Sequence, residues 1–511
     1  MIPRDGSSTS LWQANETPYK TRNNIDDSRS FNIIIVGGGI TGVTTALLLQ
    51  EAGKKCLLLE AANLCFGTTG GTTAHINTLL DTPYTTISKN FGKENARLVA
   101  QAATDAVALI RENISRYKID CAFEEATAYL FAQDEKQSEE LAAIRSATEQ
   151  AGLTVQSAGT IPPAISFGQA IKIPGQAKFN PVQYVYALAK AFENAGGVIL
   201  QNCRVTGVSE NERAEVETTQ GKFMAERVVY ATHIPPGVNL IHLRCAPYRS
   251  YAMALKLNTK IYPGDLSYDM YDPYHYYRTQ IINGEPFFIA GGYDHKTGHE
   301  PNAQKCFLEL EAHCRRHFDV KEVSYQWSSQ YFEPADGLPY IGRLPGHTDL
   351  MYVASGFGGN GMTYSQVSAL VLKSILLNQD SPYISLFDPN RIKPVAGFKN
   401  FITHNVSVIK DFAGRFLAHE KIHELADMAP GEGKVVSYES KMIALYKDEH
   451  GDIHAVNPVC THLKCSVSWN NAEQTWDCPC HGARYTPDGQ MVTGPSSIDL
   501  EKIHIEELIE K

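Results

Sequence analysis

Residues near the C-terminal end of the 511-residue chain have the types and spacing of an iron–sulfur site. Four cysteines fall within 21 residues, and two histidines stand beside them in C-x-H and C-x-x-H pairs. Two thiolates and two imidazoles suit a two-iron cluster in which Cys holds one iron and His holds the other, an arrangement that raises the reduction potential. The predicted ligands are Cys460, His462, Cys478 and His481.

Zinc is the alternative metal for these loops, because clustered Cys and His with short spacings also bind it. The C-x-H pair is tighter than the usual zinc knuckle, however. Zinc would also leave Cys465 and Cys480 over, at matching positions in the two loops. We therefore favour the iron–sulfur cluster.

A second group of residues, near the N-terminal end, could hold the phosphates of a dinucleotide. An apolar segment at 31–36 predicts a buried strand, followed by Gly37-Gly-Gly39-Ile-Thr-Gly42, a helix over about 41–52, a strand at 56–59 and Glu60. The first glycine permits a tight turn, the second lets backbone N–H groups approach a pyrophosphate, and the third allows the helix to pack on the strand. The acid can accept hydrogen bonds from a ribose.

Later segments indicate which dinucleotide is expected. They are Gly67-Thr-Thr-Gly-Gly-Thr-Thr-Ala74, the apolar segment 227–233, Asp336-Gly-Leu-Pro-Tyr-Ile-Gly342 and the glycine-rich segment 351–363. In this order, after the first glycine turn, they resemble the D-amino-acid oxidase superfamily of FAD-dependent amine and amino-acid oxidoreductases. The resemblance covers about residues 31–377. It implies FAD, since no second strand, glycine turn and acid unit is present for a nicotinamide nucleotide.

The resemblance also indicates which residues would bind FAD. The acid after the second strand would bind the adenosine ribose, and the small-residue run would lie beside the flavin. The late glycine motif would close over the isoalloxazine ring and the ribityl chain. The expected FAD-binding residues are Gly37, Gly39, Ile40, Thr41, Gly42, Glu60, Thr68, Thr72, Thr73, Ala74, Val205, Ala231, Thr232, Gly356, Gly358, Gly361 and Met362.

The two cysteine–histidine loops read C-T-H-L-K-C and C-P-C-H-G and resemble the Rieske domains of the cytochrome bc type, over about residues 427–507. This resemblance implies a disulfide between Cys465 and Cys480. A Gly-Pro pair at 494–495 resembles the start of a third loop that flanks the cluster, although serines at 496–497 replace the usual Ala-Pro.

Together, the two resemblances match FAD-dependent oxidoreductases with a fused C-terminal Rieske domain. Further marks of that family are Ser10-Leu-Trp12, Arg249-Ser-Tyr251 and Asp294-His-Lys-Thr-Gly298. The expected fold is an α/β Rossmann-like FAD-binding domain with an α+β substrate domain, followed by a small all-β Rieske domain. The expected division is an extended lead-in at 1–30, the oxidoreductase at 31–377 (FAD-binding segments about 31–83, 169–246 and 331–377, substrate segments about 84–168 and 247–330), a linker at 378–426 and the Rieske domain at 427–511.

The candidate catalytic residues are few. A tyrosine-rich segment, 268–277, precedes Arg278, and Tyr277 with Arg278 could form a wall for a carboxylate or amine. Tyr is also a favoured strand residue, however, and Arg278 could be an internal ion-pair partner. His75 follows the run expected beside the flavin and could have no ligand role, hydrogen-bond the flavin or bond to it covalently. The resemblance predicts Lys at this point, so His75 departs from the pattern and no specific substrate is carried over.

Composition and charge exclude other classes. The chain has 46 Lys and Arg residues against 56 Asp and Glu residues, and no run of basic residues is long enough to bind along the phosphates of a nucleic acid. No nucleic-acid partner is therefore expected. The uncharged stretches 31–50 and 350–372 reach the length of a membrane span, but their glycine clusters predict turns that lead into helices. The first thirty residues are polar and lack the apolar core of a secretion signal, so a cytoplasmic protein is expected.

The leading functional hypothesis is an enzyme that takes a hydride from the C–N bond of an amine or amino acid to FAD. The electrons would then pass singly to the cluster and on to an unidentified external acceptor. Two alternatives stay open: an oxygen-using flavin oxidase with a structural or regulatory cluster, and a non-catalytic electron carrier or redox sensor. An iron oxygenase is not expected, because no downstream segment supplies a two-His, one-carboxylate iron site.

We predict that the Ala483→Ser variant has a higher cluster potential than the native chain. By resemblance, high-potential Rieske proteins have a serine here and a tyrosine two residues later, and both hydroxyls stabilise the reduced cluster; this chain keeps only Tyr485. One charge-assisted hydrogen bond is worth about 1.5 to 3 kcal/mol, or roughly 60 to 130 mV for one electron. Protein-film voltammetry measures the shift, and an unchanged or lowered potential contradicts the prediction.

Overall fold

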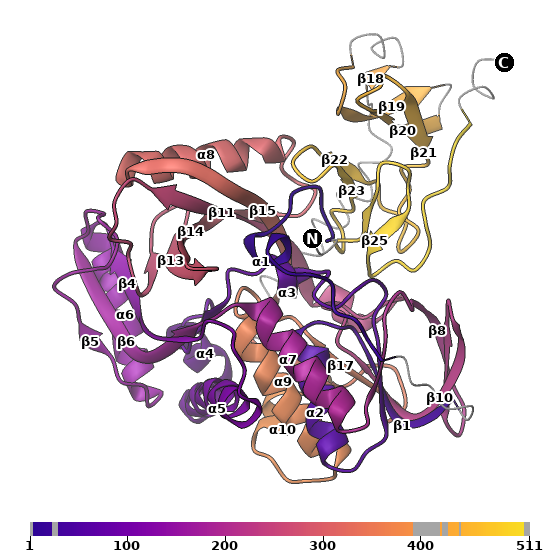
Figure 1. Ribbon diagram of the computed structural model, residues 1–511, viewed down its shortest axis with the longest axis horizontal. Coiled ribbons are helices and arrows are strands. Elements are labelled where there is room, and N and C mark those ends of the chain that lie inside the picture. The colour runs from indigo at the N-terminus through magenta and orange to yellow at the C-terminus, as the bar shows by residue number, and fades with distance from the viewer. Residues whose placement is uncertain (1–3, 23–28, 392–419, 422–427, 439–440, 505–511) are drawn as a thin grey trace.

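The computed structural model describes residues 4–22, 29–391, 420–421, 428–438 and 441–504. Figure 1 shows a sheet covered by helices, a second and larger sheet beside it, and a small C-terminal unit, drawn in yellow, next to both. The two large sheets are built from alternating stretches of the chain. The C-terminal unit is built only from the described residues after 419.

The first sheet carries the glycine turn. Its strands run in the order β16-β17-β10-β1-β2-β7; off this path, β9 pairs with β10 and β8 pairs with β9. β1 pairs in parallel with β2 on one side and with β10 on the other, and ligands bind at such a switch point in open α/β sheets. The strands are β1 (Ser30–Val36), β2 (Cys56–Leu59), β7 (Val198–Leu200), β8 (Val205–Glu210), β9 (Ala214–Thr218), β10 (Gly221–Tyr230), β16 (Tyr340–Arg343) and β17 (Met351–Ser355).

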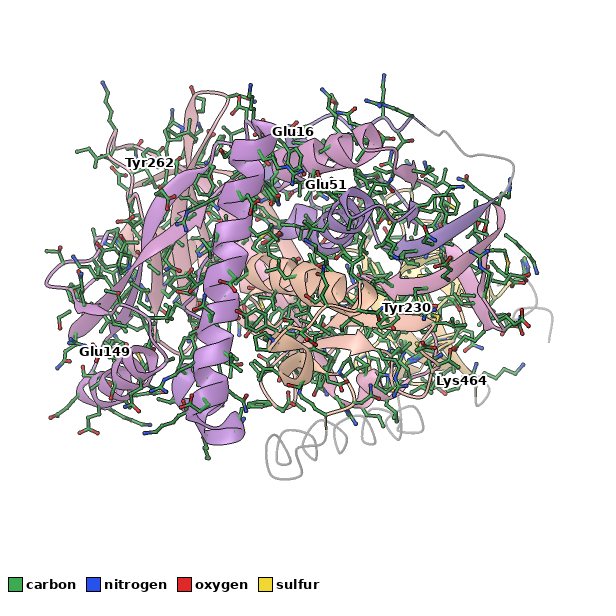
Figure 2. All side chains as sticks on the ribbon, turned by 90° about the horizontal axis from the view of Figure 1, so that it is seen from below. Glu16, Glu51, Glu149, Tyr230, Tyr262 and Lys464 are labelled. Atoms are coloured by element: carbon green, nitrogen blue, oxygen red, sulfur yellow. A yellow bond between two sulfur atoms is a disulfide. The ribbon has the colours of Figure 1, made fainter. Side chains whose placement is uncertain are left out.

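Three helices cover one face of this sheet, and α5 packs on two of them (Figure 1). Glu51, labelled in Figure 2, ends α2 and accepts a hydrogen bond from Tyr117 Oη at 2.6 Å, which joins the ends of α2 and α5. Both uncharged stretches are a strand followed by a helix, and no described helix is long and apolar enough to cross a membrane. The helices are α2 (Ile40–Glu51), α5 (Lys93–Tyr117), α7 (Pro181–Asn194) and α9 (Gly361–Leu376).

The second sheet follows the order β15-β11-β14-β13-β12-β4-β6-β3, with β5 beside β6. Neighbouring side chains point to opposite faces, as strands require. Tyr277 Oη therefore lies 2.7 Å from His313 Nε2 of the covering helix α8, while Tyr276 faces a cavity on the other side. The elements are β3 (His75–Ile76), α4 (Tyr84–Phe91), β4 (Glu124–Ala132), α6 (Glu135–Gln150), β5 (Gln156–Ser157), β6 (Gln169–Lys178), β11 (Cys245–Leu257), β12 (Leu266–Asp269), β13 (His275–Ile282), β14 (Glu285–Lys296), α8 (Ala303–His317) and β15 (Val320–Pro334).

The two sheets correct the division of the chain expected from the sequence. The expected FAD-binding segments include β3 and β6, but both strands belong to the second sheet, because β6 pairs antiparallel with β4 and with β3. Conversely, α5 falls in an expected substrate segment, yet it packs on α7 and α9 beside the first sheet. Its buried face is rich in alanine, including Ala96, Ala103 and Ala106, which allows close approach of the neighbouring helices.

The N-terminal segment is not an extended lead-in where the structure describes it. Ser10 caps a short helix, α1 (Leu11–Ala14). Leu11 and Trp12 are fully buried. Trp12 Nε1 also donates a hydrogen bond to the carbonyl of Thr72 at 2.6 Å. Two large apolar side chains in a polar stretch therefore anchor this segment on the core.

The C-terminal unit contains only strands and loops in its described residues, as expected for a small all-β domain. Its sheets have the orders β18-β19-β20-β21 and β22-β23-β24-β25. Within the expected linker, α10 (Tyr383–Phe387) packs against β16, α5 and α9 of the first sheet and its helices. Residues 392–419 and 422–427 lie outside the described part of the chain. The strands are β18 (Glu420–Lys421), β19 (Gly433–Tyr438), β20 (Lys441–Lys447), β21 (Ile453–Val456), β22 (Ser468–Asn470), β23 (Thr475–Asp477), β24 (Arg484–Tyr485) and β25 (Met491–Thr493).

Buried charges join the C-terminal unit to the rest of the chain. Arg484 Nε lies 3.2 Å from Asp477 Oδ1 within the unit, and Arg484 Nη1 lies 3.2 Å from Asp5 Oδ2 of the N-terminal segment. Arg249 of β11 approaches Asp477 Oδ2 at 3.6 Å. All four side chains are almost completely buried. Because a buried charge is costly without a partner, these pairs fix the docked position.

Further contacts extend this docking area. Glu473 Oε1 of the C-terminal unit accepts a hydrogen bond from Ser328 Oγ of β15 at 2.6 Å. Gly298 has a φ of +74°, and a Cβ there would lie 3.0 Å from Pro479, which stands between two of the clustered cysteines. Two sequence marks, at Arg249 and at 294–298, therefore lie where the two parts of the chain meet.

We predict that Asp477→Asn lowers the free energy of unfolding by about 3 to 5 kcal/mol, the usual cost of breaking a buried ion pair. The substitution keeps the side-chain shape but removes a charge that offsets Arg484 and Arg249. Urea unfolding of the full chain measures the loss. The control Asp349→Asn removes an exposed partner of Arg227 and should cost less than about 1 kcal/mol. Equal losses in the two variants would contradict the prediction.

Asp477→Asn should also change how the free energy of unfolding depends on pH. Burial alone would raise the pKa of Asp477, but Arg484 and Arg249 outweigh it and hold that pKa below its ordinary value. A carboxyl of this kind stabilises the fold above its unfolded pKa of about 4, and the contribution is lost as the pH falls through the folded pKa. The free energy of unfolding should therefore fall less steeply below about pH 4 in the variant.

Candidate functional site

A cavity of about 590 Å³ lies between the two sheets. Its size is in the range that binds cofactors. Most residues that the sequence predicts to bind FAD line it, although they come from distant parts of the chain. They are Gly37, Gly39, Ile40, Thr41, Glu60, Thr68, Thr72, Thr73, Val205, Ala231, Thr232, Gly358, Gly361 and Met362.

Three of the expected FAD residues lie behind the cavity wall. A Cβ at Gly42 would collide with the carbonyl of Gly37, so Gly42 lets α2 pack closely on the turn. Ala74 is fully buried with a φ of +57°, and Gly356 turns the chain after β17 with a φ of +74°. These residues shape the wall and do not reach the cavity.

The glycine turn directs the start of α2 into the cavity. Gly37 has a φ of +114°, which L side chains rarely adopt. The N–H of Gly38 donates to Glu60 Oε2 at 2.6 Å, and the N–H of Ile40 donates to Thr69 Oγ1 of α3 (Thr68–Gly71) at 3.1 Å. The first N–H groups of a helix have no partner within it and attract a pyrophosphate. The turn, the ribose acid and the cavity together fit FAD.

Of the three candidate catalytic residues, His75 lines the cavity. Burial lowers its pKa well below the ordinary value, so the ring is neutral. Tyr277 faces α8, on the other side of the sheet, and Arg278 Nη1 donates to the carbonyl of Ala74 at 2.6 Å. Neither Tyr277 nor Arg278 reaches the cavity. Strand alternation and a structural hydrogen bond therefore favour the structural alternative that the sequence left open for these two residues.

The C-terminal unit and the N-terminal segment complete the cavity wall, which the sequence analysis did not predict. Arg4 and Asp5 line it, as do Thr486, 490–494 and 496–497. Arg204 Nη1, next to the expected FAD residue Val205, lies 3.2 Å from Met491 Sδ. No sequence motif marks these contacts, because they depend on how the domains dock.

The four predicted cluster ligands come together on two loops of the C-terminal unit. Cys460 and Cys478 are both buried. The rings of His462 and His481 lie 5.0 Å apart at 89°. His462 Nδ1 is buried and has no hydrogen-bond partner among the described residues. Two thiols and two imidazoles at one place fit a two-iron cluster.

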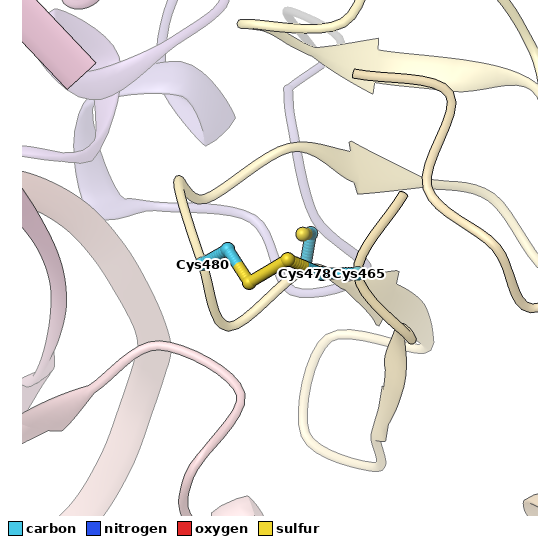
Figure 3. Close-up of side chains that lie close together, drawn as sticks. All are labelled: Cys465, Cys478 and Cys480. Atoms are coloured by element: carbon cyan, nitrogen blue, oxygen red, sulfur yellow. A yellow bond between two sulfur atoms is a disulfide. The ribbon is translucent and has the colours of Figure 1, made fainter. Parts of the chain in front are cut away.

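The predicted disulfide between Cys465 and Cys480 is present and joins the two loops. Figure 3 shows its yellow S–S bond, with the thiol of Cys478 separate from it. The three sulfurs lie close enough together to hold a metal, but two of them are oxidised to the disulfide. The disulfide therefore disfavours zinc held by a thiol triad, and the four residues predicted from the Rieske resemblance remain the candidate ligand set.

One loop of the FAD-binding sheet touches both the cavity and the cluster ligands. Pro236 lines the cavity. His462 Nε2 lies 3.2 Å from the carbonyl oxygen of the next residue, Gly237. Since a carbonyl only accepts hydrogen bonds, Nε2 must carry the proton, which leaves the lone pair of Nδ1 for iron. The ring of His242 packs 4.6 Å from the ring of His462.

Comparison with known proteins finds the same two parts. The FAD dependent oxidoreductase family matches residues 32–374, and the Rieske [2Fe-2S] domain family matches residues 419–504. These matches confirm the predicted cofactors and fold class. The chain is 31% identical to the Bacillus subtilis protein YhfW, named as a Rieske 2Fe-2S iron-sulfur protein, over 97% of this chain and 98% of that protein.

Two more distant similarities concern the larger domain. Gamma-glutamylputrescine oxidoreductase of Escherichia coli is 22% identical and aligns with 72% of this chain and 88% of its own length. The crystal structure of glycine oxidase from Geobacillus kaustophilus has a TM-score of 0.59 at 18% identity, over 71% of this chain and 99% of that chain. The fold is therefore shared with an amino-acid oxidase.

We predict that Tyr485→Phe lowers the reduction potential of the cluster. Tyr485 Oη lies 3.2 Å from Cys460 Sγ, and burial raises the pKa of this tyrosine, so its hydroxyl stays protonated and can donate to the thiolate. The loss should be on the order of 60 to 130 mV, as for other charge-assisted hydrogen bonds. The control is Tyr446→Phe, since Tyr446 packs on Trp469 at 4.9 Å. Voltammetry of the full chain should show no shift for the control, and equal potentials in both variants would contradict the assignment.

Proposed function

Since this chain belongs to the FAD dependent oxidoreductase family and carries a C-terminal Rieske [2Fe-2S] domain, we propose that it oxidises the carbon–nitrogen bond of an amine or amino acid. In this proposal the substrate carbon gives a hydride to FAD, and electrons pass singly to the cluster and on to an external acceptor. The cofactors supply this redox chemistry, FAD as a two-electron acceptor and the cluster as a one-electron carrier.

The names of two similar proteins support an amine or amino acid as the substrate. One is an oxidoreductase named for an acylated diamine, and the other is an oxidase named for an amino acid. The cavity supports it as well, because one of its ends carries the residues that fit FAD and the other is lined by side chains of the second sheet. A small substrate in the second position would lie against the cofactor.

The proposed reaction removes a hydride, with its two electrons, from the carbon that bears a neutral nitrogen, and a protonated imine remains. Water adds to the imine carbon and releases a carbonyl compound and ammonia or an amine. Tyr268 Oη accepts from Asn77 Nδ2 at 2.6 Å and lies 2.7 Å from His75 Nδ1, to which it can donate its own proton. In that tautomer His75 Nε2 carries the proton of the ring.

One observation carries the electron route. The residues 231–237 follow β10, contribute to the cavity wall and end at the carbonyl that faces His462. The docked position of the C-terminal unit therefore places a cluster ligand against the wall of the FAD cavity. This arrangement supports electron transfer within one chain, because no rearrangement of the two domains is needed to bring the sites together.

We predict that an amine or amino acid from a screened panel bleaches the flavin absorbance in the absence of oxygen and that electron paramagnetic resonance then detects the reduced cluster. In the control variant Cys478→Ser, which lacks a cluster ligand, the flavin should still bleach while the cluster signal is absent. Rapid reoxidation by oxygen without any cluster signal would instead support a flavin oxidase. A flavin that no substrate bleaches would support an electron carrier.

A further inference from the structure

The cavity has two chemically different ends. One end is formed by the glycine turn and Glu60 and fits the phosphates and adenosine of FAD. The other end is formed by the second sheet and by the segment that follows β3, and it combines carboxylates, phenol rings and an imidazole. These residues are His75, Asp81, Tyr268, Tyr274, Tyr276 and Asp294.

The two carboxylates at this end are held by neutral donors. Asp81 Oδ2 accepts a hydrogen bond from the N–H of Gly359 at 2.8 Å. Asp294 Oδ2 accepts one from Tyr331 Oη at 3.0 Å. Neither carboxylate forms an ion pair with a cationic side chain in the described part of the chain. Their negative charge is therefore left without a counter-charge from the protein.

Neighbouring acids add to this negative charge. The side chains of Asp81, Asp294 and Glu333 are exposed. Partial loss of water around them raises their pKa values, to about 6 for Asp81 and to about 7 for Glu333. The charge of Asp294 contributes at Asp81, and the charges of both aspartates contribute at Glu333. Carboxylates that destabilise one another in this way are stabilised by a cation that enters between them.

The positively charged side chains of the cavity wall are engaged elsewhere. Arg4 Nη2 donates to the carbonyl of Ser328 at 2.6 Å and lies 3.7 Å from Glu473, within the docking area of the C-terminal unit. Arg204 contacts Met491 of that unit. A substrate carboxylate is best bound by Arg or Lys. None of the residues that form the acidic end is an Arg or Lys.

Aromatic rings complete the acidic end. The rings of Tyr274 and Tyr276 lie 5.7 Å apart, and the ring of His75 meets that of Tyr276 edge-on at 5.6 Å. Ring faces attract ammonium groups. His75 Nε2 is also buried there without a hydrogen-bond partner among the described residues, so this wall holds a polar atom that no described protein group satisfies.

We propose that this end binds the protonated amino group of a diamine or polyamine between Asp81 and Asp294, and that it rejects amino acids. The second nitrogen of the substrate is then the neutral one next to the oxidised carbon. An α-carboxylate would face two carboxylates and no Arg or Lys of this part of the cavity wall, which is unfavourable. The oxidation step rests on the proposed function, whereas the binding preference does not.

The first test compares three probes on the purified holoenzyme in the absence of oxygen. They are 1,4-diaminobutane, butylamine, which lacks the second amino group, and ornithine, which is the same diamine with an added carboxylate. The perturbation of the flavin absorbance on rapid mixing gives each dissociation constant. We expect 1,4-diaminobutane to bind at least about tenfold more tightly than the other two, as for one lost charge-assisted contact. Equal or tighter binding of ornithine or butylamine would overturn the proposal.

The second test uses Asp294→Asn and Asp81→Asn, which keep the hydrogen-bond acceptor but remove the charge. Each should weaken binding of 1,4-diaminobutane by about tenfold and leave butylamine unchanged. Asp319→Asn is the matched control, because Asp319 is exposed and bonds Asn258 outside the cavity. Unchanged affinity for the diamine in both variants, with normal flavin content, would refute the site.

The outcomes separate the two proposals. Oxidation of ornithine or another amino acid in preference to a diamine would refute the acidic end as a substrate site and leave the proposed function standing. Selective binding of the diamine that depends on Asp81 and Asp294, without flavin reduction, would support the site and refute the proposed oxidation.

Discussion

The docked position of the C-terminal unit depends on a buried group of opposite charges. Arg249 comes from the second sheet, Asp5 from the N-terminal segment, and Asp477 and Arg484 from the unit itself. None of these charges could be buried alone, since removing an ion from water costs several kcal/mol that only a close partner offsets. The arrangement is therefore specific: a displaced unit would leave unpaired charges on both surfaces.

Both candidate sites follow from this constraint. The docked unit contributes residues to the wall of the FAD cavity and brings His462 against the carbonyl of Gly237. That single contact sets the tautomer of the imidazole and joins the cluster ligands to the cavity wall. The N-terminal segment serves the same end, because its apolar anchor, Leu11 and Trp12, holds Asp5 where Arg484 can reach it.

The two sites differ in their electrostatics as their proposed tasks require. The cluster loops bury two thiols and a protonated tyrosine, with the disulfide holding the loops together. Such a setting stabilises the cluster through hydrogen bonds to sulfur rather than through full charges. The far end of the cavity instead carries the carboxylates Asp81 and Asp294. It therefore suits a positively charged molecule.

The sequence alone determined the local chemistry. The glycine turn with Glu60 and the predicted cluster ligands, Cys460 to His481, are short motifs whose spacing reports the backbone shape that each cofactor requires, so they could be recognised without a fold. The second sheet was harder to divide, because β6 pairs with β4 over a long separation in sequence. The position of Tyr277 and Arg278 outside the cavity could not be read from the sequence, since strand alternation and the neighbours on each face decide where side chains point. The acidic end, the docking charges and the contact of His462 with Gly237 were set by tertiary structure alone, because each joins residues that are distant in sequence and become neighbours only when the domains pack.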